Sequence, residues 1–268
     1  MKISKRHIPL LLIFAIAVII SSCSKSGGGN STPMVSMVTT IAGTGSAGAV
    51  NGTGTTASFY FPSSLAYSSN GLLYVGDFGN SLIRTINVSS GAVSTFAGTG
   101  TPGLVNGPLT SAEFDGTANI VFDGTGDLFV ADEENNVIRE ITSAGNVITL
   151  AGTGIAGYQD GPATTAQFDY PEGMVIDANG NLYVADGHNN VIRKIVISTG
   201  VVSTYAGIAG TSGFNNGALT SATFNDPYGL ALDASGNIYV ADILNNCIRK
   251  ITVSTGTVST YAGSGTQG

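Results

Sequence analysis

The stretch Asn181-Leu-Tyr-Val-Ala-Asp-Gly-His-Asn-Asn-Val-Ile-Arg-Lys-Ile195 returns almost unchanged as Asn237-Ile-Tyr-Val-Ala-Asp-Ile-Leu-Asn-Asn-Cys-Ile-Arg-Lys-Ile251. Two weaker copies stand earlier in the chain, and every copy keeps an aspartate and an arginine seven residues apart. These pairs are Asp77/Arg84, Asp132/Arg139, Asp186/Arg193 and Asp242/Arg249. A second marker, which begins Ala-Gly, recurs in steps of 55, 54, 55 and 56 residues at Ala42, Ala97, Ala151, Ala206 and Ala262. The chain is therefore built from an internal repeat.

One unit of this repeat contains four short apolar stretches separated by turn residues. In the last copy we expect strands over residues 228–233, 238–242, 247–253 and 257–262, and Gly236 supplies the positive φ that a tight hairpin needs. Four antiparallel strands per repeat are typical of a β-propeller blade. We therefore predict an all-β propeller over residues 35–268, with four-stranded blades at about 59–97, 114–151, 168–206 and 224–262.

The composition fits this class of fold. Glycine makes up 38 of the 268 residues, about twice the usual share of ~7%. Hydrophobic residues reach 43%, which excludes a disordered chain. The net charge of −7 argues against nucleic acid as a partner, because a phosphate backbone needs cationic contacts.

The two quoted stretches also resemble the NHL repeat, and the resemblance extends over all four units. It implies a β-propeller, usually of six blades, that most often serves as a binding surface and in a minority of relatives as an enzyme. Two departures stand out. The second unit lacks the Pro-x-Gly before its first strand and has Asp115-Gly-Thr-Ala118, and in the first unit Gly76 replaces the alanine before Asp77.

The N-terminus has the order of a targeting segment. Lys2, Lys5 and Arg6 precede an apolar stretch over residues 8–20 that is too short to span a bilayer as a helix. Ile20-Ser-Ser-Cys23 resembles the bacterial lipobox, in which the cysteine is lipidated. We expect a signal peptide at 1–22, a lipidated Cys23, a flexible tether at 23–34 and a location in the bacterial cell envelope, facing periplasm or cell surface. The alternative is an ordinary secretory signal with an incidental cysteine.

The two ends of the repeat array do not match. Residues 35–42 look like a lone fourth strand, while the chain stops after the fourth strand of the last unit. We therefore predict four complete blades plus one stray strand, without proper closure. A fragment of a longer, six-blade-like protein is the favoured explanation. An open arc completed by another chain, or a strained four-blade ring, are the alternatives.

Long segments separate the blades, and residues 154–168 are an example. Pro108 and Pro162 lie in these segments where a short helix could begin. Each segment ends in an Ala-x-Phe triplet that we expect to pack under the next blade. The triplets begin at Ala57, Ala112, Ala166 and Ala222.

Strand direction places each Asp-x-x-Asn loop and each long segment on one rim, and loops on a rigid scaffold are where binding residues usually lie. The repeated Asp and Arg are read as scaffold, with a ring of four carboxylates that binds a cation such as Ca²⁺ as the alternative. The residues that vary between copies are the better candidates for contact with a protein or glycan. They are Phe78, Glu133, Glu134, Tyr158, Gln159, Asp160, His188, Phe214, Ile243 and Leu244.

Signals for catalysis are weak. His188 is the only histidine left after removal of residues 1–22, and no Gly-x-Ser-x-Gly motif occurs. Cys247 stands where other copies have Leu or Val and is read as a small buried residue. We predict no catalytic residues and no cofactor. The alternative function is a metal-dependent, lactonase-like hydrolase or lyase, for which Glu172 is the unrepeated acid to consider.

Overall fold

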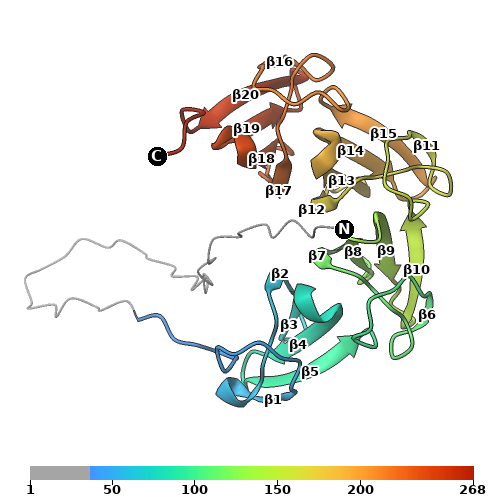
Figure 1. The fold of residues 1–268 in the computed structure, drawn as a ribbon, viewed down its shortest axis with the longest axis vertical. Coiled ribbons are helices and arrows are strands. Elements are labelled where there is room, and N and C mark those ends of the chain that lie inside the picture. Colours follow the sequence, from blue (N-terminus) through green and yellow to red (C-terminus); the bar gives the residue numbers. More distant parts are fainter. Residues whose placement is uncertain (1–36) are drawn as a thin grey trace, which may run out of the picture.

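The computed structural model describes residues 37–268 as four antiparallel sheets that surround a common centre (Figure 1). Blade 1 is followed along the chain by blades 2, 3 and 4. The all-β propeller predicted from the repeat is confirmed. The short helical pieces are single 3₁₀ turns, the first at Gly54–Thr56 and three more after the second long strand of blades 1, 3 and 4, at Phe78–Asn80, Gly187–Asn189 and Ile243–Asn245.

Each blade contains four long strands in meander order. The innermost strands are β2 (Pro62–Tyr67), β7 (Thr117–Phe122), β12 (Pro171–Ile176) and β17 (Pro227–Leu232). The second strands are β3 (Leu72–Asp77), β8 (Leu128–Asp132), β13 (Asn181–Asp186) and β18 (Ile238–Asp242). The third strands are β4 (Leu82–Asn87), β9 (Val137–Ile141), β14 (Val191–Val196) and β19 (Cys247–Thr252). The outer strands are β5 (Ala92–Ala97), β10 (Asn146–Ala151), β15 (Val201–Ala206) and β20 (Thr257–Ala262).

A fifth, two-residue strand completes the outer edge of every sheet, which the four-stranded prediction missed. These strands are β1 (Gly52–Thr53), β6 (Gly107–Pro108), β11 (Gly161–Pro162) and β16 (Gly217–Ala218). They come from the long segments, which fold back on the blade that follows them. The short helices expected at Pro108 and Pro162 are therefore wrong, because both prolines lie in these edge strands, where a missing N–H does no harm.

The N-terminal strand expected at 35–42 is also wrong for the part that the structure describes. Residues 37–42 form no strand, and Met37 and Val38 are largely exposed. In the complete blades the equivalent strand pairs with a third strand, as β5 does with β4, whereas residues 37–42 pair with no strand among residues 37–268. The predicted signal peptide, tether and Cys23 lie outside the described residues.

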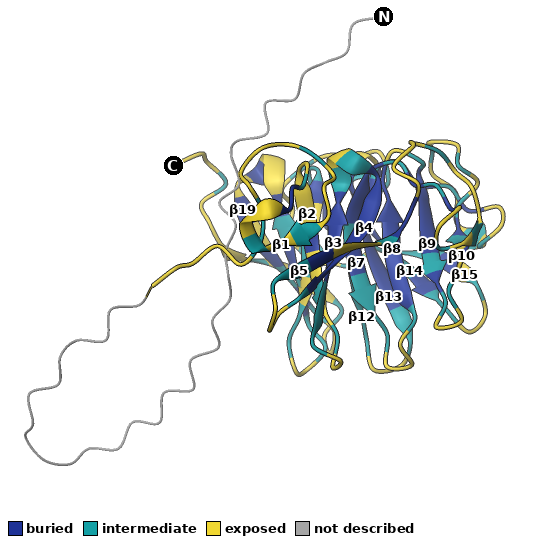
Figure 2. Ribbon diagram, turned by 90° about the horizontal axis from the view of Figure 1, so that it is seen from below, coloured by how far each residue is buried: buried dark blue, intermediate teal, exposed yellow. Residues whose placement is uncertain are grey.

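The core consists of the interfaces between blades. One face of blade 2, which includes Ile138 and Ala151, packs against blade 3, and Ala166 and Phe168 fill the space between them. Blades 1 and 2 repeat this arrangement around Phe114, and blades 3 and 4 repeat it around Phe224. The Ala-x-Phe triplets thus pack as predicted. Figure 2 shows the result as buried strands in the blades with exposed loops at both edges.

The four blades form an open arc. The inner strands pack in the order β2, β7, β12 and β17, and β17 does not pack back on β2 in the way that neighbours do (Figure 1). This agrees with the predicted lack of closure. Among residues 37–268, no helix has the length and apolarity to cross a membrane.

Candidate binding face

The repeated aspartate and arginine form the same buried contact in every blade. One arginine N–H donates to the aspartate Oδ2 at 2.7–2.9 Å, and neither side chain has exposed surface. The other carboxylate oxygen accepts a backbone N–H from the residue two positions before the inner strand. These donors are Tyr60, Asp115, Asp169 and Asn225. The interpretation of this pair as scaffold is confirmed, because it joins the loop, the third strand and the inner strand of each blade.

The surroundings of these aspartates do not suit a shared cation. Burial raises the pKa of Asp132 and of Asp186 to about 6, although the adjacent arginine and N–H donors oppose the rise. Each carboxylate is occupied by its own arginine rather than turned toward the other blades. Within residues 37–268, no three His, Cys, Asp or Glu side chains converge where they could hold a metal ion.

The short and long loops do share one rim, as strand direction predicted. The asparagine three residues after each aspartate carries an amide that donates to a carbonyl of the long segment at 2.7–2.8 Å. The donor and acceptor pairs are Asn80/Gly48, Asn135/Gly103, Asn189/Gly157 and Asn245/Gly213. This hydrogen bond holds the long segment over its own blade, so both loops move with the sheet.

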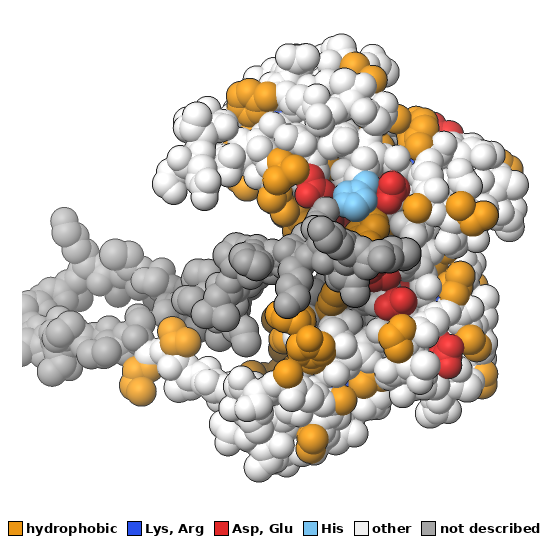
Figure 3. Space-filling model, viewed as in Figure 1, with side chains coloured by type: hydrophobic (Ala, Val, Ile, Leu, Met, Phe, Trp, Pro, Cys, Tyr) orange, Lys and Arg blue, Asp and Glu red, His pale blue; other side chains and the backbone are white. Residues whose placement is uncertain are grey.

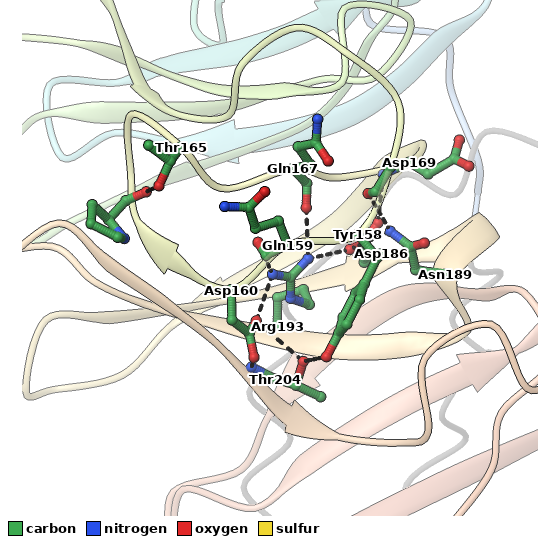
Figure 4. A network of polar contacts seen from close by, with 12 residues as sticks. Tyr158, Gln159, Asp160, Thr165, Gln167, Asp169, Asp186, Asn189, Arg193 and Thr204 are labelled. Carbon is green, nitrogen blue, oxygen red and sulfur yellow. Dashed lines mark hydrogen bonds and ion pairs between the residues drawn. The ribbon is translucent and has the colours of Figure 1, made fainter.

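Four of the ten candidate residues lie on the outer part of this rim, around the buried arginines. In blade 3, the Tyr158 ring lies 4.9 Å from the Arg193 guanidinium (Figure 4). The Gln159 carbonyl and the Asp160 Oδ1 accept hydrogen bonds from the same Arg193 nitrogen at 2.8 and 2.7 Å. Phe214 covers Arg249 in the same way at 5.1 Å. Through these contacts the outer residues help to hold the buried arginines in place. Tyr158 and Phe214 nevertheless expose about two fifths of their surface.

Asp160 occupies a repeated position that the sequence comparison overlooked. Asn51, Asn106 and Asn216 make the equivalent hydrogen bond to their own arginines at 2.8 Å. All four residues lie 33 positions before the arginine, so alignment of the copies on that arginine would have revealed them. Asp160 is therefore part of the scaffold as well as of the rim.

The inner part of the rim is centred on Tyr170, which the sequence analysis did not select. Its ring lies 4.2 Å from the His188 ring, and its hydroxyl donates to Glu134 Oε2 of blade 2 at 2.9 Å. His188 Nδ1 lies 3.2 Å from Asp169 Oδ1. We call Tyr170, His188, Glu134 and Asp169 the inner cluster. Figure 3 shows the histidine flanked by acidic side chains near the centre of this face.

A left-handed backbone conformation explains why Tyr170 reaches this place. Its φ is 57°, and Phe61, Gly116 and Asp226 adopt positive φ at the same point of the other blades. In blades 3 and 4 an asparagine of the preceding blade holds this turn in place. The Asn136 side chain accepts the Tyr170 N–H at 3.0 Å, and the Asn190 side chain accepts the Asp226 N–H at 2.9 Å. The side chain at this position therefore projects from the junction between two blades.

The remaining candidates lie on the same rim in other blades. Phe78 is half-buried against blade 2, and Glu133 is almost fully buried next to the exposed Glu134. In blade 4, Ile243 and Leu244 expose 42% and 59% of their surface. Burial, and to a smaller extent the nearby Glu134 carboxylate, raises the pKa of Asp115.

Glu172 lies behind the inner cluster rather than on the surface. Its carboxylate is 2% exposed and lies close to Gly187, as does that of Asp226. A Cβ at residue 187 would stand 3.0 Å from Asp226 Oδ1 and 3.2 Å from Glu172 Oε1, so a larger residue would disturb both carboxylates. Cys247 is 7% exposed, in agreement with the interpretation as a small buried residue.

Comparison with known proteins supports the repeat assignment. The NHL repeat pattern matches residues 59–86 and 168–195, which are the inner three strands of blades 1 and 3. Residues 59–86 and 168–195 are therefore similar to NHL repeats and lie within a β-propeller fold. NHL repeat-containing protein 2 of Bos taurus is 34% identical over 144 residues, which are 50% of this chain and 20% of that protein.

Two bacterial structures share the fold of this propeller. A structural genomics protein of unknown function from Bacteroides thetaiotaomicron is 27% identical with a TM-score of 0.60, over 70% of this chain and 46% of that one. An auxiliary nutrient binding protein from Bacteroides ovatus is 20% identical with a TM-score of 0.59, over 77% of this chain and 50% of the other. The chain thus spans about half the length of these structures and a fifth of the bovine relative.

Proposed function

We propose that this chain is a lipid-anchored binding module of the bacterial cell envelope, which holds a protein or glycan on its loop-bearing face. The scaffold of that face is the same in every blade, whereas the side chains above it differ. A rigid platform with variable exposed residues is the usual arrangement of a binding surface. The proposal needs no cofactor.

The observation that carries the proposal is the inner cluster. It combines two adjacent rings with two carboxylates at the junction of blades 2 and 3. A tyrosine ring offers an apolar surface to a sugar or a side chain at little entropic cost, and carboxylates accept hydrogen bonds from hydroxyl or ammonium groups. The same chemistry thus serves either class of partner.

The charge of the described chain favours a partner that brings hydroxyl groups or positive charge. All 17 acidic residues lie within residues 37–268, and the four arginines there are fully buried. Lys194 and Lys250 are the other cationic residues of this part. Nucleic acids and other polyanions would be repelled. The nutrient-binding protein from Bacteroides ovatus supports the proposal only in that its name describes a binding role on the same fold.

Removal of both rings from the inner cluster should weaken partner binding strongly. We expect the Tyr170→Ala/His188→Ala variant to bind at least tenfold more weakly, because central aromatic residues carry much of the energy of such contacts. Binding is measured on a glycan array and by capture from envelope extract of the native bacterium, followed by titration of the partner found.

The matched control is Phe214→Ala on the outer rim, where an exposed ring is lost from the same face. It should leave binding within about threefold. If Phe214→Ala abolishes binding while the double variant retains it, the partner sits on the outer rim and the inner cluster is the wrong site.

The proposed lipid anchor predicts that labelling with palmitate depends entirely on Cys23. Incorporation of labelled palmitate into the chain in bacterial cells should disappear in Cys23→Ser, because the lipid is attached to that thiol. Cys247→Ser, which changes the only other cysteine, should retain the label. Label that persists in Cys23→Ser would rule out the lipobox.

A further inference from the structure

A groove lies at the outer side of the junction between blades 2 and 3. It has a volume of about 370 Å³ and separates the outer strand β10 from the segment that leads into blade 3. Its lining is uncharged and includes Leu104, Thr149, Leu150, Gly152, Ala163 and Thr164. We call this hollow the outer groove. It shares no residue with the inner cluster, and a complete blade stands on each side of it.

The small side chain of Ala163 is the first reason why this groove is open. The Ala163 carbonyl accepts the Gly152 N–H at 2.9 Å, which ties the segment to blade 2. At the other two junctions a leucine carbonyl makes the same contact at the same distance, in the pairs Gly98/Leu109 and Gly207/Leu219. Both leucine side chains pack against the core of their junction. Alanine fills less of this space, because its side chain ends at Cβ.

A second position is also smaller at this junction. Leu150 precedes the last alanine of its outer strand, whereas Phe96 and Tyr205 precede the equivalent alanines of blades 1 and 3. Both rings pack against the core of their junction. The groove is therefore a property of the junction between blades 2 and 3 rather than of the repeat.

Leu104 forms an exposed apolar wall of the outer groove. Its Cδ2 would lie 3.1 Å from a Cβ on Gly154, so it reaches across to the segment of the next blade. The equivalent residues Tyr158 and Phe214 instead lie over buried arginines. Leu104 exposes 42% of its surface and the nearby Ile155 exposes 65%. An apolar group can thus enter the groove from outside.

Carboxylates accompany this uncharged groove on blade 2. The Glu113 carboxylate lies against Gly103, the residue before Leu104. Glu140 stands opposite Ile148 in the pairing of β9 with β10. Burial raises the pKa of the Glu140 carboxyl, and two nearby aspartate carboxylates add to the rise. A positively charged group beside the groove would be attracted.

We propose that the outer groove binds a leucine side chain from a basic segment of a partner protein. Leu109 and Leu219 argue for this side chain, because they occupy the same place at the other two junctions. The carboxylates of blade 2 argue for lysine or arginine beside it. This contact goes beyond the proposed function, since it adds a second site and selects a protein over a glycan.

Acetylated tripeptide amides test the groove directly, and the probes are Lys-Leu-Lys, Lys-Ala-Lys and Glu-Leu-Glu. The full chain carries isotope-labelled leucine methyl groups and is titrated by NMR. Lys-Leu-Lys should shift the Leu104 and Leu150 methyl signals in a saturable way. Lys-Ala-Lys should bind about ten- to 50-fold more weakly, because it buries less apolar surface. Glu-Leu-Glu should also bind more weakly, because its charges are repelled.

Three variants of the chain locate the binding. Ala163→Leu fills the groove with the side chain that the other junctions hold, and it should weaken binding of Lys-Leu-Lys by about tenfold or more. Ala178→Leu adds the same side chain to an exposed hairpin of blade 3 and should bind as the native chain does. Glu113→Gln should weaken Lys-Leu-Lys more than Glu-Leu-Glu. Thermal melts verify that all three variants are folded.

Four results would overturn the proposal. Equal affinity for Lys-Leu-Lys and Lys-Ala-Lys would show that no leucine enters the groove, and unchanged binding by Ala163→Leu would place the peptide elsewhere. Methyl shifts that grow with chain concentration in the absence of peptide would assign the groove to a second copy. Shifts caused by maltotriose but by none of the peptides would assign it to a glycan. Because the probes are not the natural partner, the groove and the proposed function can fail separately.

Discussion

Arg193→Ala is expected to lower the free energy of unfolding by about 3–5 kcal/mol, because it leaves the Asp186 carboxylate buried without its counter-ion. The substitution also removes the hydrogen bonds to Gln159 and Asp160. For a chain of this size the loss corresponds to a fall in Tm of roughly 6–20 °C. Circular dichroism melts and urea titrations measure both quantities.

The neighbouring Lys194→Ala serves as control. The lysine ammonium lies 5.9 Å from the Tyr183 ring and is partly exposed, so its loss should cost less than about 1 kcal/mol. A second test adds Asp186→Asn to Arg193→Ala, which removes the lone charge but keeps an oxygen for the Asp169 N–H. Part of the stability should return. If Arg193→Ala is as stable as Lys194→Ala, the buried pair does not hold the blade together.

The same variant should show a defined pH dependence. Burial already raises the pKa of Asp186 to about 6, and loss of the guanidinium should raise it further. A raised pKa in the folded state means that the folded chain holds the proton more tightly, so stability falls as the pH rises through that pKa. The Arg193→Ala penalty should therefore be larger at pH 8 than at pH 5.

Phe168→Ala is the second substitution with a large expected effect. The ring is fully buried between blades 2 and 3 and lies 5.0 Å from the Arg193 guanidinium. Its removal leaves a cavity that the two sheets cannot close, so the expected loss is about 3–5 kcal/mol. Urea titration at constant pH measures it.

Phe59→Ala is the matched comparison, since Phe59 has the same place in blade 1, and residues 37–268 contain no blade that packs on it from the other side. The ring is only partly buried, and Ala42 is the neighbour from the preceding segment. The loss should be clearly smaller than for Phe168→Ala. Equal losses would mean that packing within one blade, rather than between blades, dominates the core.

The candidate site was only partly predictable from the sequence. The repeated Asp and Arg were assigned to the scaffold because every blade needs them, and the buried pairs bear this out. Variation between copies selected His188 and Glu134, which do meet at one junction through Tyr170. It could not distinguish them from Tyr158 and Phe214, which cover buried arginines on the outer rim.

Tyr170 was missed because its neighbours in space come from other parts of the chain. Glu134 lies 36 residues before it and in another blade, and Asn136, which fixes its backbone, lies 34 residues before it. The signal that could have revealed it is weak, since Phe61, Gly116 and Asp226 share its conformation but no side-chain chemistry. The positive φ of Phe61, Tyr170 and Asp226 cannot be read from their residue types and is seen only in the structure.

The sequence by itself determined the blade, because alternating apolar residues, turn glycines and the Asp–Arg spacing are local properties that recur every 54–56 residues. Tertiary structure decided the fifth strand and the two parts of the rim. Those features depend on how one blade packs against the next. Ile248 is exposed and Ile192 is buried in nearly identical stretches of sequence, because only Ile192 has a following phenylalanine above it.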